Sequence, residues 1–384
     1  MMSRHHLELA HLFKEFGHEL RGITKTQYKV INAIENCRTN ALGGHIVSCS
    51  SCDFKKNAYN SCRNRHCPKC QYISKIKWIE KRKEDLLPCP YFHVVFTIPD
   101  SLREIFTQNK EVCYNLLFKA SSETLKEVAA NPKHLGADIG FIGILHTWTQ
   151  DLIDHPHVHY VVPAGGICSK RENWKKGSEK FLLPTKVLAK VFKGKLIDMI
   201  KRSYQSKELS LSEDLKTLHM FESFLNDLSF KDWNIYAKKP FAGPEQVINY
   251  LGQYTHRIAI SNYRLVRLEG DQVTFKVRDK DNPGKSTLKT LKVREFLRRF
   301  LLHILPRGFV RIRHFGILGN RYRKRNLSLI REIEKITEIY QSLASLGSDE
   351  LLKKVFNIDI HQCPKCDEGI LTPKAELNTF YNSS

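Results

Sequence analysis

The sequence predicts an α+β fold, in which helices flank a central antiparallel sheet and a small zinc-ribbon-like module precedes it. Two observations favour this class. Candidate strands and helices follow one another without the regular alternation of a parallel nucleotide-binding sheet. Residues 37–71 are polar and rich in cysteine, so this segment cannot form an apolar core alone. At 384 residues the chain is long enough for two or three domains.

Hydrophobic periodicity gives the elements in order. We expect helices over residues 5–35 with a turn near Gly22, then over 75–87, 101–130, 183–205, 210–229, from Pro244 to about Tyr254, and over 291–303. β-Branched and aromatic residues predict strands over residues 91–98, 139–148, 158–162, 257–260, 263–268, 272–277 and 309–313. Three regions follow: a helical arm with the zinc module (1–85), the α+β domain (86–325) and a helical tail (326–384).

The charge balance indicates a polyanionic partner. Lys and Arg number 62 against 40 Asp and Glu, a net charge of +22. Nucleic acid is favoured over an acidic membrane surface, because no basic amphipathic helix ends in exposed Trp or Leu anchors. No run of eighteen apolar residues occurs, and residues 1–17 lack the apolar core of a signal peptide, so neither membrane spanning nor secretion is expected.

The cysteines indicate metal rather than disulfides. Eleven are present, an odd number without an export signal, and six fall between Cys37 and Cys70. Two C-x-x-C knuckles predict a first zinc site, and the remaining ligands form a second legal set of four. The first set is Cys49, Cys52, Cys67 and Cys70, and the interleaved second set is Cys37, His45, Cys62 and His66. The alternative is that the cysteines are buried free thiols.

Basic residues surround this module, and a further cysteine pair occurs elsewhere in the chain. Arginines, among them Arg63 and Arg65, surround the ligands, which favours DNA binding over catalysis because full ligation leaves no open coordination position. Near the other end of the chain, Cys363-Pro-Lys-Cys366 forms half a knuckle, with His361 as the one nearby candidate ligand. A third zinc ion and an idle pair of thiols both remain open for this pair.

A histidine-rich strand predicts a second kind of metal site. His157 and His159 lie two residues apart, so they share one face of a strand. If this strand pairs with the preceding one, either His146 or Gln150 supplies a third ligand, depending on the register. Imidazole with one carboxamide oxygen, plus open coordination positions, suits Mn²⁺ or Mg²⁺ in phosphoryl transfer. The alternative is a structural histidine pair.

Two tyrosines are candidate nucleophiles. Tyr250 and Tyr254 are four residues apart, which stacks their phenols on one face of the expected helix. Two packing tyrosines would be the ordinary interpretation, but Gly252 between them is unusual for a packing helix, and His256 and Arg257 follow directly. A phenol is a weak nucleophile at its free pKa near ~10, and a divalent ion on the phosphate makes attack feasible.

A basic and aromatic segment predicts single-strand binding. Residues 285–325 interleave thirteen Lys or Arg with phenylalanines and one acidic residue, Glu295. Cations would hold phosphates and exposed aromatics would stack on bases, although most of the phenylalanines are expected in the core. The candidate DNA-binding residues are Arg63, Arg65, Arg257, Arg298, Arg299, Arg307, Arg311 and Arg313.

These motifs together resemble the two-tyrosine HUH transposases of bacterial rolling-circle insertion sequences, the family numbered ninety-one. The resemblance covers CRTNALGGHIVSCSSC and YNSCRNRHCPKCQ, FHVVFTIP, HTWTQ with HPHVH, INYLGQYTHRIAISNYRL, and FLRRFLLHILPRGFVRIRHFG. It implies an HUH-endonuclease-like sheet in residues 86–325, with His157 and His159 as ligands and Tyr250 and Tyr254 as nucleophiles. It also implies cleavage of single-stranded DNA at the ends of the element, a 5′-phosphotyrosine on the enzyme, and a cytoplasmic, nucleoid-associated bacterial protein.

Other functions compete with this one. A plasmid replication initiator or relaxase shares the nicking chemistry but acts on a plasmid rather than on an insertion sequence. A zinc-binding DNA regulator would use the histidines and tyrosines only structurally, and a decayed element protein would be inactive.

Overall fold

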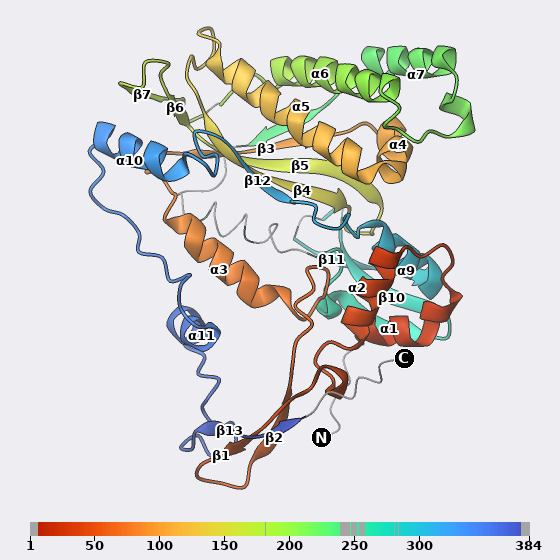
Figure 1. Ribbon diagram of the computed structural model, residues 1–384, viewed down its shortest axis with the longest axis vertical. Coiled ribbons are helices and arrows are strands. Elements are labelled where there is room, and N and C mark those ends of the chain that lie inside the picture. The colour runs from red at the N-terminus through yellow and green to blue at the C-terminus, as the bar shows by residue number, and fades with distance from the viewer. Residues whose placement is uncertain are drawn as a thin grey trace.

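The computed structural model describes residues 7–180, 182–238, 246, 252, 258–279, 281–282 and 284–377. Its centre is a five-stranded antiparallel sheet (Figure 1). In spatial order the strands are β12 (Ile312–Gly316), β4 (Gly140–Trp148), β5 (Asp154–Pro163), β3 (Tyr91–Thr97) and β8 (Ile235–Lys238). The predicted fold class is thus confirmed. The short strand predicted near 309–313 begins later, at Ile312, and is β12 at one edge of this sheet.

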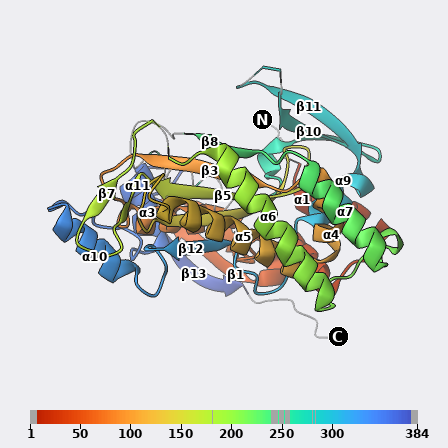
Figure 2. The same ribbon diagram turned by 90° about the horizontal axis from the view of Figure 1, so that it is seen from above.

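Helices cover one face of the sheet. They are α4 (Arg103–Gln108), α5 (Lys110–Ala130), α6 (Thr185–Gln205) and α7 (Leu218–Phe230) (Figure 2). Alternate residues of β5, Val158, Tyr160 and Val162, point into the main core that these helices close. The period of two then sends His157 and His159 to the opposite face.

The opposite face carries helix α3 (Gln71–Lys83) (Figure 1). Trp78 and Ile79 of this helix pack against a small cluster formed by Tyr91, Ile144 and Val161 of the sheet. The histidine face therefore has an apolar neighbour on α3.

A second core joins the N-terminal helices to residues 259–304. Helices α1 (Leu9–Phe16) and α2 (Lys25–Glu35) pack with α9 (Val293–Leu302) and with a three-stranded sheet of β9 (Leu265–Glu269), β10 (Gln272–Arg278) and β11 (Ser286–Lys292). Phe13 and Phe300 meet edge to face, with ring centroids 5.8 Å apart. Residues before 40 thus share a core with residues 259–304. The strand predicted over 257–260 is not formed at its described residues, 258–260.

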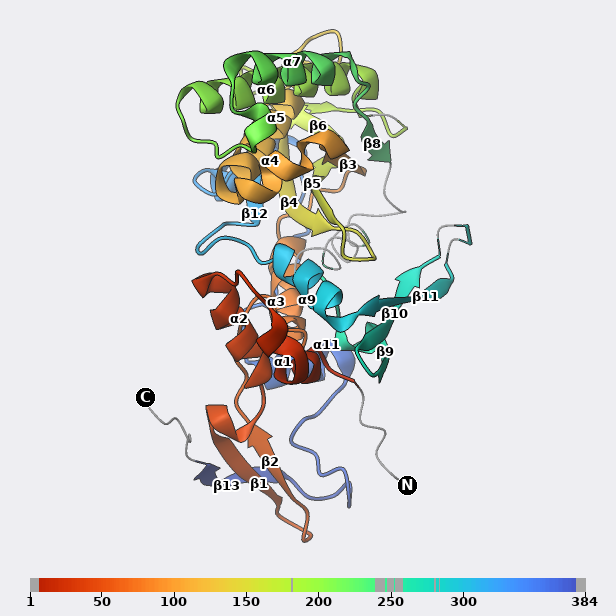
Figure 3. The same ribbon diagram turned by 90° about the vertical axis from the view of Figure 1, so that its right-hand side faces the viewer.

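A separate ribbon lies at the far end of the molecule (Figure 3). Strand β1 (Gly44–Cys49) pairs with β2 (Lys55–Tyr59) on one side and with β13 (Leu371–Leu377) on the other. The predicted helical tail therefore contains helices α10 (Arg323–Ile333) and α11 (Ser348–Phe356) but ends, in its described part, as a strand. The remaining strands, β6 (Gly165–Ile167) and β7 (Trp174–Lys176), form a small hairpin.

Within the described ranges, no helix is long and apolar enough to cross a membrane. The predicted division of the chain at residues 85 and 325 remains a prediction.

Candidate functional site

Three buried histidines meet on the sheet face that points away from the main core. His157 and His159 lie on β5, and His146 lies directly opposite His157 on β4. One ligating atom from each ring lies within 4.8 Å of the other two. Of the two residues that the sequence offered as a third ligand, the register therefore brings His146 to this place. Gln150 lies four residues further on, in the turn between the strands.

A hydrogen bond orients the ring of His157. Nδ1 of His157 lies 2.6 Å from the carbonyl oxygen of His155, and a carbonyl only accepts, so Nδ1 carries the proton and Nε2 keeps its lone pair. Burial lowers the pKa of His157 to about 4, so the ring is neutral near neutral pH. A neutral imidazole with a free lone pair is the form that binds a metal ion.

The sequence analysis missed a fourth histidine beside this cluster. His93 on β3 is buried, and its Nε2 lies 2.7 Å from Nδ1 of His159, with the two rings stacked. If Nδ1 of His159 donates this hydrogen bond, Nε2 is the ring atom that would face an ion, the usual arrangement behind a metal-binding histidine. The only sequence signal was that His93 lies on a predicted strand. Its proximity to His159 depends on the pairing of β3 with β5.

The tyrosine segment is connected to this face at one described residue. Tyr250, Tyr254 and Arg257 lie outside the described residues, as does most of the helix predicted from Pro244. Gly252 is described, and a Cβ added there would lie 2.3 Å from Cδ1 of Ile79. The Gly252 backbone therefore packs directly on α3, on the side of the sheet where the histidines lie.

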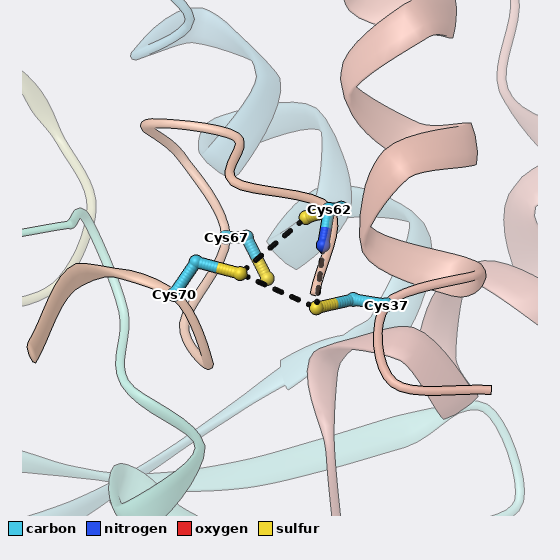
Figure 4. A group of neighbouring side chains, drawn as sticks. All are labelled: Cys37, Cys62, Cys67 and Cys70. Atoms are coloured by element: carbon cyan, nitrogen blue, oxygen red, sulfur yellow. Dashed lines mark hydrogen bonds between the residues drawn. The ribbon is translucent and has the colours of Figure 1, made fainter. Parts of the chain in front are cut away.

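Four thiols meet at the base of α2 (Figure 4). Cys37, Cys62, Cys67 and Cys70 each offer a sulfur within 4.8 Å of the others, and the Sγ of Cys70 lies 3.4 Å from that of Cys37 and 3.6 Å from that of Cys62. Tetrahedral zinc at Zn–S distances of about 2.3 Å separates its sulfurs by about 3.8 Å, so the cluster fits zinc closely.

The predicted partition of the zinc ligands is wrong. Cys67 and Cys70 do not meet Cys49 and Cys52, which lie instead with Cys363 and Cys366. The two knuckles are close in sequence, which favours a shared ion, but β1 carries Cys49 away from Cys67 and into the ribbon.

Neither predicted histidine ligand joins a cysteine cluster among the described residues. His45 lies on β1, opposite Ala58 and Glu376 of the neighbouring strands. His66 is buried, and burial together with the charges of Arg65 and Arg311 lowers its pKa to about 3. The interleaved second site is therefore not formed.

Some predicted DNA-binding arginines converge. Arg63, Arg65 and Arg311 line one pocket of about 400 Å³, although they come from the cysteine-rich segment and from the strand region near β12. Nη1 of Arg65 donates to the carbonyl oxygen of Phe309 at 2.8 Å, which joins the two regions. Arg311 is buried beside Arg65, so the pocket concentrates positive charge.

The other predicted arginines have different surroundings. Arg298 and Arg299 both pair with Glu295, each at 2.7 Å, and Arg307 is exposed after α9. The guanidinium of Arg313 lies 4.2 Å from the ring centroid of Phe118, so part of this side chain packs on the protein. As expected, the phenylalanines of this segment are largely core, namely Phe296, Phe300 and Phe309.

Comparison with known proteins identifies the family. Residues 8–98 match the family described as "Transposase zinc-binding domain", and residues 140–326 match the family described as "Putative transposase". The protein named "Putative transposase y4qJ" of Sinorhizobium fredii is 41% identical over 377 residues, which cover 96% of this chain and 95% of the relative. The chain belongs to the transposases of insertion-sequence family ninety-one.

A second relative agrees with this assignment. The "Transposase for insertion sequence element IS801" of Pseudomonas savastanoi pv. phaseolicola is 28% identical over 364 residues, or 93% of this chain and 84% of the relative. No solved structure matches the chain. As a member of this transposase family, the protein is a DNA-cleaving enzyme that acts on DNA and carries a zinc-binding domain.

Proposed function

We propose that this transposase of a rolling-circle insertion sequence nicks one DNA strand at the element ends by tyrosine attack and transfers that strand. The observation that carries the proposal is the group of three buried imidazoles, His146, His157 and His159, on two adjacent strands. A structural role would not require three imidazole rings to direct their ligating atoms to one point.

The three histidines would hold a divalent ion. Their donor set of three nitrogens leaves coordination positions for phosphate oxygens, and Mg²⁺ or Mn²⁺ there would polarise the scissile phosphate. The chain positions the ligands itself: the His155 carbonyl fixes the tautomer of His157, and His93 packs behind His159. Rigid strands rather than loops carry all of these groups.

Tyr250 and Tyr254 would supply the nucleophiles. The phenol oxygen of one tyrosine forms a bond to the phosphorus, and the bond from phosphorus to the 3′ oxygen breaks. The strand then carries a 5′-phosphotyrosine link to the enzyme, and the proton lost by the phenol is balanced by the proton gained by the 3′-OH. A second tyrosine would allow a second transfer. Gly252 supports this placement, because it lies between the two tyrosines in sequence and packs on Ile79 of the helix that covers the histidine face.

The arginine pocket would hold the backbone of the single strand. Arg63, Arg65 and Arg311 concentrate positive charge at one place, and bidentate guanidinium groups suit phosphate. Arg298 and Arg307 are also exposed, on α9 and after it, and would be further phosphate contacts. Unpaired DNA is favoured over a duplex because Tyr322, which lies between Arg321 and Arg323 in sequence, is exposed and would stack on an unpaired base.

A covalent adduct tests the proposal. The full chain is incubated with Mn²⁺ and labelled single-stranded oligonucleotides that carry the element ends, and denaturing gels and mass spectrometry then seek a nucleotide on a peptide from residues 245–257. The wild type should form the adduct, and Tyr250→Phe with Tyr254→Phe should abolish it. Tyr263→Phe is the matched control, because Tyr263 is nearby in sequence and exposed. An adduct that survives the double substitution would contradict the tyrosine assignment, and a wild type that forms none would contradict the mechanism.

A further inference from the structure

The last cysteine pair of the chain lies against the N-terminal ribbon. Cys363 and Cys366 fall outside both family matches, which cover residues 8–98 and 140–326. Strand β13, which follows them, pairs antiparallel with β1, with Leu371 opposite Cys49. Two segments about three hundred residues apart in sequence thus form one ribbon (Figure 3).

The four sulfurs of this ribbon have the separation that a metal ion requires. Cys49, Cys52, Cys363 and Cys366 offer sulfurs that all lie within 4.8 Å of one another. The Sγ atoms of Cys49 and Cys366 are 3.7 Å apart, as are those of Cys52 and Cys363. Four thiolates around zinc lie about 3.8 Å apart, given a Zn–S distance of about 2.3 Å in tetrahedral geometry. Disulfide bonding would bring a pair to about 2.05 Å.

The surrounding backbone suits thiolates. Backbone N–H groups point at three of the sulfurs: Ser51 N lies 3.3 Å from Cys49 Sγ, Lys365 N lies 3.5 Å from Cys363 Sγ, and Gly369 N lies 3.4 Å from Cys366 Sγ. Such donors stabilise the deprotonated sulfur that binds metal. The first cluster has the same feature, since Asn64 N lies 3.5 Å from Cys62 Sγ.

One glycine is required for this approach. A Cβ on Gly369 would lie 2.1 Å from the Sγ of Cys49, so any side chain there would displace the sulfur. The loop after Cys366 is therefore shaped to bring backbone close to the cluster.

The ribbon has little else to hold it together. Among the described residues of β2, none is buried, and β13 has no buried residue either. Cys363 and Cys49, in contrast, are buried. A three-stranded sheet with no apolar face is not stable by itself, whereas a tetrahedral zinc site contributes folding free energy directly.

We infer that Cys49, Cys52, Cys363 and Cys366 bind a second structural zinc ion, which ties the C-terminal segment to the N-terminal module. The zinc-binding region of this chain is then built from both of its ends. Four thiolates fill the coordination shell, so this ion takes no part in catalysis. The inference does not depend on the proposed tyrosine chemistry.

Zinc content of the purified full chain tests the inference. After denaturation, metal analysis should find two zinc ions per wild-type chain and one in the Cys363→Ser, Cys366→Ser double variant. Cys49→Ser with Cys52→Ser should also leave one, and all four substitutions together should still leave one, because both pairs belong to the same site. Cys89→Ser with Cys168→Ser is the matched control and should leave two, since these cysteines lie outside both clusters.

Other results would overturn the inference. Two zinc ions in the Cys363→Ser, Cys366→Ser variant would mean that this pair binds no metal. Disulfide bonds detected among the four cysteines of the wild type would mean that these cysteines are oxidised and do not bind zinc. If the variants fail to fold, cadmium-113 NMR of the wild type decides: two resonances of tetrathiolate type are expected, and one would contradict a second site. Cys366→His, which keeps a zinc ligand, should retain the second ion.

Discussion

The cysteine clusters and the histidine cluster are built in opposite ways. Each cysteine cluster presents four sulfurs, enough to close a tetrahedral shell, and lies in loops and at the ends of helices or strands. The histidine cluster presents three nitrogens from the middle of two paired strands. Closed shells stabilise a fold, and an incomplete shell on a rigid sheet leaves positions for substrate. The number and kind of ligands thus distinguish the two clusters that we expect to stabilise the fold from the cluster that we propose performs the chemistry.

The largest effect is expected from the histidine cluster. His157→Ala removes one of the three ligands, so adduct formation with single-stranded DNA should fall by about 10³-fold or more, because several kcal/mol of charge stabilisation is lost. The melting temperature should change little in comparison. A gel assay for the adduct and thermal unfolding measure the two quantities.

The control for this variant is His134→Ala, which alters an exposed histidine outside the cluster. A His157→Ala variant that keeps wild-type cleavage while folded would show that the histidines are structural. The contrast between the two kinds of cluster would then fail.

The converse pattern is expected from the first cysteine cluster. Cys62→Ser should remove one zinc ion and lower the free energy of unfolding by several kcal/mol, because metal binding to this site is part of folding. Cys113→Ser is the matched control, since Cys113 is a buried cysteine of the main core outside both clusters. Calorimetry with metal analysis checks this, and equal stability of the two variants would contradict a structural metal at Cys62.

The sequence could predict which residues are metal ligands better than it could predict which of these ligands share one ion. The period of two in His157-Val-His159 places both rings on one face, and in the fold Val158 between them points into the main core. The choice between His146 and Gln150 depended on the register of β4 with β5, which shifts between His146 and Trp148. No sequence pattern announces such an irregularity, so the third ligand could not be assigned from spacing.

The cysteine pairs show the same limit at longer range. A knuckle is recognised from the two residues between its cysteines, but its partner knuckle is selected by tertiary structure. Cys52 meets Cys363, which lies 311 residues away, rather than the nearby knuckle at Cys67. His93 was missed for the same reason, because its proximity to His159 arises only when β3 pairs with β5.

An intermediate effect is expected from His93, which contacts the proposed ligand His159. His93→Phe keeps a ring beside His159 but removes the nitrogen that contacts its Nδ1, so Mn²⁺ affinity should fall by about 10–100-fold. Titration of the variant with Mn²⁺, followed by calorimetry, measures this directly. His93→Gln, which can still accept a hydrogen bond, should recover part of the affinity. An unchanged affinity for His93→Phe would limit His93 to packing.

A smaller effect is expected where the tyrosine segment meets α3. Gly252→Ala would place a methyl group 2.3 Å from Cδ1 of Ile79, so adduct formation should fall by about tenfold as the segment shifts. Adding Ile79→Ala removes the clash and should restore most of the activity. Gly194→Ala on α6 is the matched control, because a Cβ there has open space. If Ile79→Ala gives no recovery, the contact between Gly252 and α3 does not position the nucleophiles.

The smallest effect is expected from an arginine of the pocket, and it tests DNA binding independently of both kinds of cluster. Arg63 is exposed at the pocket that it shares with Arg65 and Arg311, so Arg63→Gln should remove about one phosphate contact. The slope of log K against log salt for a single-stranded oligonucleotide should then become less negative by about 0.7, with zinc content unchanged. Arg202→Gln on α6 is the matched control, since Arg202 is exposed and pairs with Asp198 away from this pocket. Equal slopes for the two variants would remove Arg63 from the DNA-binding surface, and a loss of zinc in Arg63→Gln would show that this arginine supports the neighbouring Cys62 rather than DNA.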